Sequence, residues 1–463
     1  MMANDESTDG LTEAAGARSG EVSRRTVLQS VTVAAGGGLA SLVAGAVSAA
    51  QNPTSPSAPA GPRRGAPDRR FRALVRYGTG AQVEELTLLP RRPNEVVVRT
   101  EASAPCYTIV RQLLGTNVAR QASIPNHAGV GVVEEVGPLV KRVQVGDRVI
   151  VAGTPQCGQC YHCLQGRADW CALLTVDNHP VAQMRDGTPV FEGGYLGGLS
   201  ELMVVTEEYC CPVFTQVPAV ELALLGDQAS VGLSAGMNLA PIDHGADVVV
   251  MGCGPVGLSA VQSARIMGAG QIIAIEPIKT RRDLALKLGA TLVLDPNAEG
   301  DKLVTRIREI CKGRTNRVYA GGRFQDPTNV NVPVGADFTI EAVGGDAFPP
   351  KVEVGPDPTG ILPLRQAWEF TRAGGHVTYL GFGQRGDVSF PGIWFANRGR
   401  TLHAGQHGGM NMLRDLPRYV TLIERGYFDM KSMITGTYPI DRTIEAVQAV
   451  ADRTAVAPVI VFA

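Results

Sequence analysis

The chain has 463 residues, which is enough for two packed domains and additional segments. Hydrophobic residues make up 44% of it and charged residues 19%, a composition typical of soluble globular proteins. The formal net charge is -1, so the chain lacks the excess of basic residues typical of nucleic-acid-binding proteins, and we expect no nucleic acid among its partners. The 55 glycines indicate many tight turns, as in α/β folds with short connections.

Residues 1–50 have the organisation of an export signal rather than of a folded element. After a polar, acidic start, Arg24 and Arg25 precede a weakly apolar stretch, 27–50, which ends in small residues suited to a signal peptidase. This order resembles a twin-arginine signal, which implies the twin-arginine export machinery as a partner and a periplasmic or cell-surface location. If the signal is not cleaved, the protein stays cytoplasmic or membrane-anchored, although Gly36–Gly38 disfavour a transmembrane helix.

Residues 51–67 are rich in Pro, Ser and Ala, and this composition predicts a linker. From 68 to 226, short β-branched runs are divided by Gly, Pro and Asn, which predicts a mostly β domain. Its strand candidates include Glu95–Thr100, Gly131–Val136 and Arg148–Ala152.

From 227 to 425, strands alternate with helical stretches, which predicts a doubly wound parallel sheet and an α/β fold class. The strand candidates are Asp247–Met251, Gln271–Glu276, Thr291–Leu294, Phe338–Ala342 and His376–Gly381. The end of the chain, 426–463, returns to short strands and one helix, Thr443–Arg453. Two stretches, Gly313–Val334 and Asp346–Pro363, have the character of surface insertions.

A GxGxxG loop follows the first strand of the predicted parallel sheet and precedes a helical stretch, Leu258–Met267. Its glycines permit a tight turn, close approach of a pyrophosphate and close helix–strand packing, while the helix N-terminus offers free N–H groups to the phosphates. The next strand ends in Glu276, where a carboxylate is expected to bind the ribose hydroxyls and to repel a 2′-phosphate, which favours NAD over NADP. The expected cofactor-binding residues are Gly252, Gly254, Pro255, Val256, Gly257 and Glu276.

Four of the nine cysteines lie in one short stretch with the spacing CxxCxxC-x7-C: Cys157, Cys160, Cys163 and Cys171. Four thiolates held this closely suit tetrahedral zinc with no open position, which predicts a structural metal. Disulfides are the alternative interpretation, and export would favour them because exported proteins meet an oxidising environment. Paired CxxC turns, however, suit metal better than two unstrained disulfides.

The four-cysteine lobe, preceded by Gly146-Asp147-Arg148-Val149 and followed by the glycine loop, resembles the zinc-dependent alcohol dehydrogenases of the medium-chain dehydrogenase/reductase superfamily. The resemblance covers nearly all of residues 71–463. It implies a GroES-like catalytic domain, a Rossmann domain for NAD, a catalytic zinc in the cleft between them, and a homo-oligomer.

The resemblance also implies the catalytic residues. Cys106 and His127, the latter in the run NHAGVGVV, stand where the family has its first two zinc ligands. Asp227 resembles the acidic third ligand of the formaldehyde dehydrogenase and dismutase branch, and Thr108 stands where a hydroxyl takes the alcohol proton. The implied chemistry is that zinc acts as a Lewis acid on the alcohol oxygen while hydride passes to the nicotinamide; the reverse reaction reduces an aldehyde.

Each ligand also has a plainer interpretation. Cys106 fits a small buried apolar residue, His127 a hydrogen-bonded loop histidine, and Asp227 a helix cap. The chain departs from the family where Ala128 replaces the glutamate of the GHE motif and Ile109 replaces the acid that orients the histidine. Loss of such a partner commonly weakens metal binding or activity 10–100-fold.

Some family members also bind the pyrophosphate with an arginine near the last strand, and residues 454–459 contain none. Three hypotheses remain: a zinc- and NAD-dependent oxidoreductase for an alcohol or aldehyde, a catalytically degenerate dinucleotide-binding protein, and a zinc-independent reductase on the same fold. Because free NAD is scarce outside the cytoplasm, the first hypothesis includes a cofactor that is exported already bound and is recycled in place.

Overall fold

The computed structural model describes residues 69–174, 178–192, 196–311, 334–345, 361–381, 388–390, 392 and 399–462. The predicted signal and linker lie outside these ranges, as does most of the two stretches interpreted as insertions. Among the helices within these ranges, none has both the length and the apolar character needed to cross a membrane.

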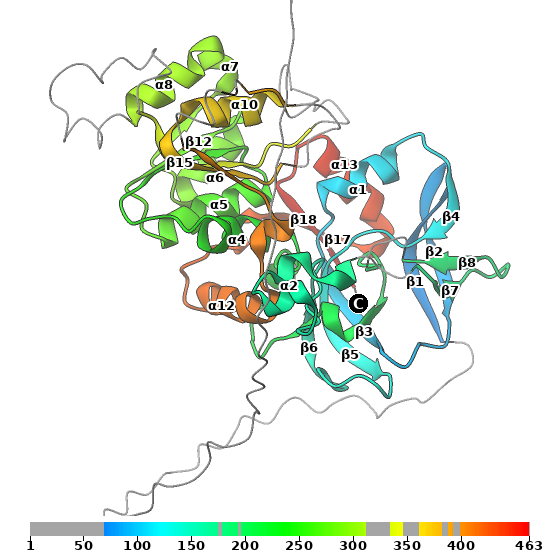
Figure 1. The fold of residues 1–463 in the computed structure, drawn as a ribbon. Coiled ribbons are helices and arrows are strands. Elements are labelled where there is room, and N and C mark those ends of the chain that lie inside the picture. The colour runs from blue at the N-terminus through cyan, green and yellow to red at the C-terminus, as the bar shows by residue number, and fades with distance from the viewer. Residues whose placement is uncertain are drawn as a thin grey trace, which may run out of the picture. The chain divides into compact units, whose positions relative to one another are not determined.

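Five strands, all from the part of the chain before residue 192, form a closed barrel (Figure 1). Its strands, in spatial order, are β1 (Arg70–Gly78), β2 (Gly80–Leu88), β7 (Pro180–Gln183), β8 (Pro189–Phe191) and β4 (Ala119–Ser123). Successive side chains of a strand point to opposite faces, so Phe71, Ala73 and Val75 all enter the barrel core, where they join Leu86. The barrel confirms the prediction of a mostly β domain here.

A second sheet completes the β domain and includes the last strands of the chain. Its order is β10 (Cys210–Pro212), β6 (Arg148–Val151), β5 (Gly129–Val136), β3 (Glu95–Ser103), β18 (Ala457–Val461) and β17 (Ile434–Pro439), with β9 (Leu202–Thr206) also paired to β3. Strand β18 pairs with β3 through Ile460 and Ser103. The C-terminal segment therefore returns to the sheet that the N-terminal part builds.

The glycine loop belongs to a six-stranded sheet in which every described pairing is parallel. Its order is β13 (Leu292–Leu294), β12 (Gln271–Ile275), β11 (Asp247–Met251), β14 (Ala336–Glu341), β15 (Thr371–Tyr379) and β16 (Thr401–His403). The strand order reverses between β11 and β14, and ligands of such sheets bind in the crevice at that point. The fold is thus the predicted combination of a GroES-like β domain and a Rossmann sheet.

Helices cover both faces of this sheet (Figure 1). On one face Val248 and Val250 of β11 share a core with α5 (Pro255–Ile266) and α6 (Lys279–Leu288). On the other, Val249 and Met251 share a core with α8 (Leu303–Ile310) and α10 (Ile361–Phe370). Strands buried on both faces read as continuous apolar runs, which is why the sequence predicted them well.

The remaining helical segments carry or support the site. They are α1 (Tyr107–Leu114), α2 (Tyr161–Leu164), η1 (Ala168–Trp170), η2 (Ala172–Leu174), η3 (Glu207–Tyr209), α3 (Ala219–Leu222), α4 (Gln228–Ser234), the π-helical η4 (Ala235–Leu239), α7 (Pro296–Glu299), η5 (Gly300–Lys302), η6 (Gln406–Gly409), α12 (Met412–Glu424), η7 (Lys431–Met433), η8 (Ile440–Arg442) and α13 (Thr443–Ala451).

Several bounds differ from the predictions. Strand β15 begins at Thr371 rather than His376, because α10 passes directly into it. Strand β16 was not predicted, since three residues are too short to show a periodic pattern. Helix α5 begins at Pro255 rather than Leu258, with the proline in the first turn, where its missing N–H costs nothing.

Candidate active site and metal centres

The four clustered cysteines converge on one point. Their sulfur atoms all lie within 4.8 Å of one another. All nine cysteines of the chain are free, and the Cys157 and Cys163 sulfurs are 3.9 Å apart, so the disulfide alternative is not formed. Four such donors in one short segment fit a tetrahedral zinc with no open position.

Backbone amides surround these sulfurs. The N–H of Cys160 donates to the Cys157 sulfur at 3.3 Å, and the N–H of Cys157 donates to the Cys171 sulfur at 3.4 Å. The backbone N–H groups of Ala172 and Cys163 lower the pKa of Cys160 to about 6, because they stabilise the thiolate. The backbone therefore favours the ionised form of Cys160, whereas burial raises the pKa of Cys163 to about 12 and also raises the pKa of Cys171.

A second donor group brings together three segments far apart in the chain. Cys106 precedes α1 at its N-cap, His127 lies between β4 and β5, and Asp227 precedes α4. One ligand atom from each lies within 4.8 Å of the other two. The three residues that the family resemblance assigned to one ion thus meet.

Asp227 occupies the N-cap position of α4, but its carboxylate does not cap the helix. Its Oδ2 instead lies 3.1 Å from the Nε2 of His127, and both side chains are largely buried. Burial acts to raise the pKa of Asp227, but the charge and hydrogen bond of His127 outweigh it, so the pKa falls to about 2. The capping alternative for Asp227 is therefore excluded.

Burial acts in the opposite sense on His127, and Asp227 again outweighs it. Desolvation disfavours the imidazolium, yet the carboxylate holds the pKa of His127 well above its usual range. The carboxylate therefore favours the charged form of His127, whereas a metal ligand needs the neutral ring.

Asn126 ties the first two donors together, and the sequence did not single it out. Its Oδ1 accepts a hydrogen bond from the Cys106 N–H at 3.3 Å. Its Nδ2 donates to Ser103 Oγ at 2.8 Å and to the Ala104 carbonyl at 3.0 Å. The residue is fully buried and has a φ of 76°, a left-handed conformation that Asn tolerates better than most residues. Its side chain therefore sets the position of Cys106 relative to His127.

The two departures from the family are packed apolar positions. Ile109 is fully buried in an apolar cluster with Leu74 and Val110. Ala128 is buried against Gly226, where a Cβ atom would lie 2.8 Å from the Ala128 Cβ. The local packing therefore fits an alanine. Thr108, the expected proton acceptor, is exposed on the first turn of α1.

His407 is a further side chain at this centre that the sequence analysis missed. Its Nε2 lies 3.7 Å from Asp227 Oδ1, and its ring centroid lies 6.4 Å from that of His127. Burial lowers the pKa of His407 to about 4, so the imidazole is neutral near pH 7. No local motif surrounds it in the sequence; only the proximity of η6 to α4 places it here.

The glycine loop has the geometry expected of a dinucleotide site. Gly252 has a φ of 83°, which glycine adopts without strain. A Cβ atom at Gly257 would lie 1.7 Å from the Gly252 carbonyl oxygen, whereas nothing lies within 4 Å of one at Gly254. Gly257 is therefore required for packing, and Gly254 leaves open space for a pyrophosphate at the start of α5, where Pro255 and Val256 lie.

Two buried carboxylates border this loop. Glu276 accepts hydrogen bonds from the Cys253 N–H at 2.6 Å and the Ile278 N–H at 3.0 Å, which places it beside the loop as predicted. Glu341, at the end of β14, was not predicted. It accepts from the N–H of Val343 at 2.8 Å and of Gly381 at 3.2 Å, so it joins the ends of β14 and β15.

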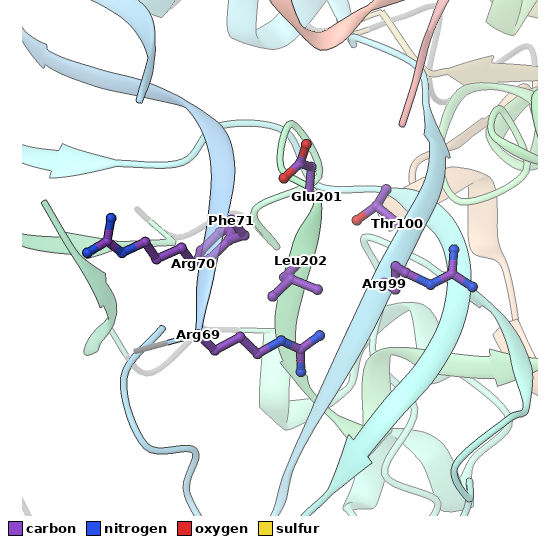
Figure 2. A pocket seen from close by; sticks show the side chains of 7 residues that line it. All are labelled: Arg69, Arg70, Phe71, Arg99, Thr100, Glu201 and Leu202. Carbon is purple, nitrogen blue, oxygen red and sulfur yellow. The ribbon is translucent and has the colours of Figure 1, made fainter. Parts of the chain in front are cut away.

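Figure 2 shows a separate cavity of about 200 Å³, lined by Arg69, Arg70, Phe71, Arg99, Thr100, Glu201 and Leu202. None of these residues belongs to a donor group or to the glycine loop. Arg69 pairs with Glu135 at 2.7 Å and Arg99 with Glu134 at 3.0 Å, so carboxylates already offset these positive charges.

Comparison with known proteins agrees with this geometry. The alcohol dehydrogenase GroES-like domain family matches residues 92–215, and the zinc-binding dehydrogenase family matches residues 255–424. S-(hydroxymethyl)glutathione dehydrogenase of Paracoccus denitrificans is 27% identical over 384 residues, which cover 80% of this chain and 94% of that protein. The NDMA-dependent alcohol dehydrogenase of Amycolatopsis methanolica is 26% identical over 393 residues, which cover 83% and 96%.

Solved structures share the fold. The structure of benzyl alcohol dehydrogenase from Acinetobacter calcoaceticus superposes with a TM-score of 0.70 at 23% identity, and the match covers 85% of this chain and 100% of that one. An alcohol dehydrogenase zinc-binding domain protein from Burkholderia ambifaria gives a TM-score of 0.71 at 24% identity, with 85% and 99% covered.

Proposed function

Because the chain belongs to the zinc-dependent alcohol dehydrogenase family, we propose that it transfers hydride between an alcohol or aldehyde and NAD. The observation that carries the proposal is the meeting of Cys106, His127 and Asp227, whose ligand atoms lie within 4.8 Å of one another. A thiolate, an imidazole and a carboxylate form a donor set that suits a catalytic zinc, because three protein ligands leave one position for substrate.

Zinc bound here would supply a Lewis acid for the substrate oxygen, and bound NAD a hydride acceptor. Cys106 and Asp227 contribute two negative charges when ionised, which balance a divalent cation, and His127 contributes a neutral nitrogen. The exposed Thr108 hydroxyl, two residues after Cys106, is the group that we assign to pass the substrate proton to solvent.

The cofactor half of the proposal rests on the glycine loop. The backbone around Gly254 receives the pyrophosphate, and the N-terminus of α5 offers it unpaired N–H groups. Glu276 is buried beside the loop, where its carboxylate accepts hydrogen bonds from the ribose hydroxyls and repels a 2′-phosphate. The carboxylate of Glu276 is the feature that favours NAD over NADP, because both dinucleotides carry the pyrophosphate.

Metal analysis together with activity tests this function. The purified protein should bind two zinc ions, and Cys106→Ser, His127→Ala and Asp227→Asn should each remove one ion and nearly all dehydrogenase activity. Cys311→Ala, a buried cysteine outside both donor groups, is the matched control and should keep both.

The rival functions give different results. A single zinc ion in the unmodified protein, with dinucleotide binding retained, would identify a degenerate dinucleotide-binding protein. Activity that survives in Cys106→Ser and His127→Ala would identify a zinc-independent reductase. These alternatives are considered because the apolar residues Ala128 and Ile109 stand where the family has acidic side chains.

A further inference from the structure

We propose that His407 is the positioning partner of Asp227, holding Oδ1 of that carboxylate so that Oδ2 faces the metal. The inference rests on the proposed function, since it concerns the catalytic zinc site. It assigns a role to a histidine far along the chain from the three donors.

The two oxygens of Asp227 face different groups. Oδ2 lies 3.1 Å from His127 Nε2, on the side of the donor cluster, and Oδ1 lies 3.7 Å from His407 Nε2. We infer that these two atoms approach to about 2.9 Å, a normal hydrogen-bond distance, when the metal binds. A carboxylate ligand is normally held in this way, by one oxygen on the metal and a hydrogen bond to the other.

The hydrogen-bonding needs of the ring select one tautomer. Within the described residues, His407 Nδ1 is buried and has no hydrogen-bond partner. If Nδ1 carried the proton, a donor would be buried unpaired and a lone pair would face the carboxylate, and both arrangements are unfavourable. The proton therefore belongs on Nε2, where it points at Asp227.

The backbone of His407 has an uncommon conformation for a non-glycine residue. Its φ of 47° and ψ of 41° are left-handed, and non-glycine residues held in such regions cluster at functional sites. The adjacent Gly408 is pressed against α4, where a Cβ atom would lie 2.2 Å from the Val231 carbonyl oxygen. Helix α4 is the helix that Asp227 precedes, so one element positions both side chains.

Gly153 leaves the space that the ring occupies. A Cβ atom there would lie 2.6 Å from His407 Nε2, so any side chain would displace the imidazole from Asp227. The Gly153 N–H also donates to the Gly226 carbonyl at 3.0 Å, directly before Asp227 in the chain. The backbone next to Asp227 and the backbone next to the His407 ring are therefore held together by this hydrogen bond.

Two substitutions of His407 separate positioning from a structural role. Asn tolerates the left-handed backbone but is too short to reach Asp227, whereas Gln carries an amide donor closer to the position of Nε2. We expect His407→Asn to weaken metal binding at the catalytic site by about 10–100-fold, and His407→Gln to recover part of this loss. His403→Asn, a half-buried histidine of β16 that pairs with His376, is the matched control.

The measurements are the Zn²⁺ affinity of each site by chelator competition and the ligand-field spectrum of the Co²⁺-substituted protein. The expected result is a weaker catalytic site with an altered Co²⁺ spectrum, while the four-cysteine site and the His403→Asn protein stay unchanged. Unchanged affinity and spectrum in His407→Asn would overturn the assignment.

A crystal structure of the zinc-loaded unmodified protein tests the same contact without any substitution. A separation of His407 Nε2 and Asp227 Oδ1 of about 3.2 Å or less supports the proposal, and a longer one refutes it. An unmodified protein that binds only one metal would instead contradict the proposed function itself, so the two failures are distinguishable.

Discussion

Asn126 shows how much one amide contributes to the position of the donors. It is fully buried, accepts from the Cys106 N–H and donates to Ser103 and Ala104, while its backbone continues directly into His127. The left-handed φ of 76° explains why glycine or asparagine suits this position, and the hydrogen bonds explain why asparagine is present.

Substitution of Asn126 separates these two requirements. Asn126→Gly keeps the backbone conformation and loses the side-chain bonds, so the free energy of unfolding should fall by about 1–3 kcal/mol. Asn126→Ala should cost about 1 kcal/mol more, because alanine is strained at positive φ. Urea unfolding of the metal-loaded proteins measures both, and an alanine variant as stable as the glycine variant would contradict this account.

At the scale of elements, the ends of β14 and β15 are joined by one buried carboxyl group. Glu341 accepts from the N–H groups of Val343 and Gly381 at the edge of the sheet where the dinucleotide is proposed to bind. Burial raises its pKa to about 7, although these N–H groups act to lower it. Its ionisation therefore affects the stability of the crevice.

The sign of the pH effect follows from the raised pKa of Glu341. Between the ordinary value of 4.5 and about 7, the folded protein holds the proton and the unfolded chain does not. Stability from this group is therefore full at low pH and is lost as the pH rises through 7, by up to about 3 kcal/mol. Glu341→Gln should gain stability relative to the unmodified protein between pH 5.5 and 8.5, as measured by chemical unfolding. A difference that does not vary with pH would contradict this.

The four-cysteine lobe is an element that its own metal has to hold together. Its helical pieces α2 and η1 have four and three residues, too few to be stable alone. The lobe also touches the loop that carries His407, since a Cβ atom at Gly405 would lie 3.0 Å from Asp169 Oδ2.

Cys163→Ser should remove the structural zinc, lower the melting temperature and expose residues 157–171 to limited proteolysis. The catalytic site should keep its own metal, because its donors lie outside the lobe. Cys211→Ser, at a buried cysteine of β10 that is not a donor, is the control. Equal zinc content in both variants would argue against a structural metal.

At the scale of the whole molecule, we propose that residues 1–50 are an export signal that directs export of the folded protein, and that NAD leaves the cytoplasm already bound. In a host cell, a mature form of the protein that begins near residue 51 should be found outside the cytoplasm. Replacing Arg24 and Arg25 with lysine should retain the full-length chain inside.

The cofactor gives an independent measurement of the same proposal. Denaturing extraction of the purified exported protein should release about one nicotinamide dinucleotide per chain. An exported protein without nucleotide would exclude the tightly bound cofactor, and a full-length chain found only in the cytoplasm would exclude export. Neither result would alter the assignment of the metal sites.

The features that the sequence predicted without structure are local. The glycine loop with its flanking strand and helix, and the four cysteines, each lie within one short segment, so spacing alone indicates their chemistry. Strands β11 and β12 are buried on both faces, so they are continuous apolar runs that the sequence alone predicts as strands. Chain order and the family resemblance were enough to name the three catalytic donors, but not to show that they meet.

Only the tertiary structure decided what lies around those donors. Asn126 and His407 belong to no motif, because their roles depend on contacts with segments distant in the chain. Asp227 has the sequence context of a helix cap, and its carboxylate turns to His127 only because the residues just before β5 and those just before α4 lie side by side. Side-chain geometry at such a meeting point is set by packing between segments, and no periodicity along one segment records it.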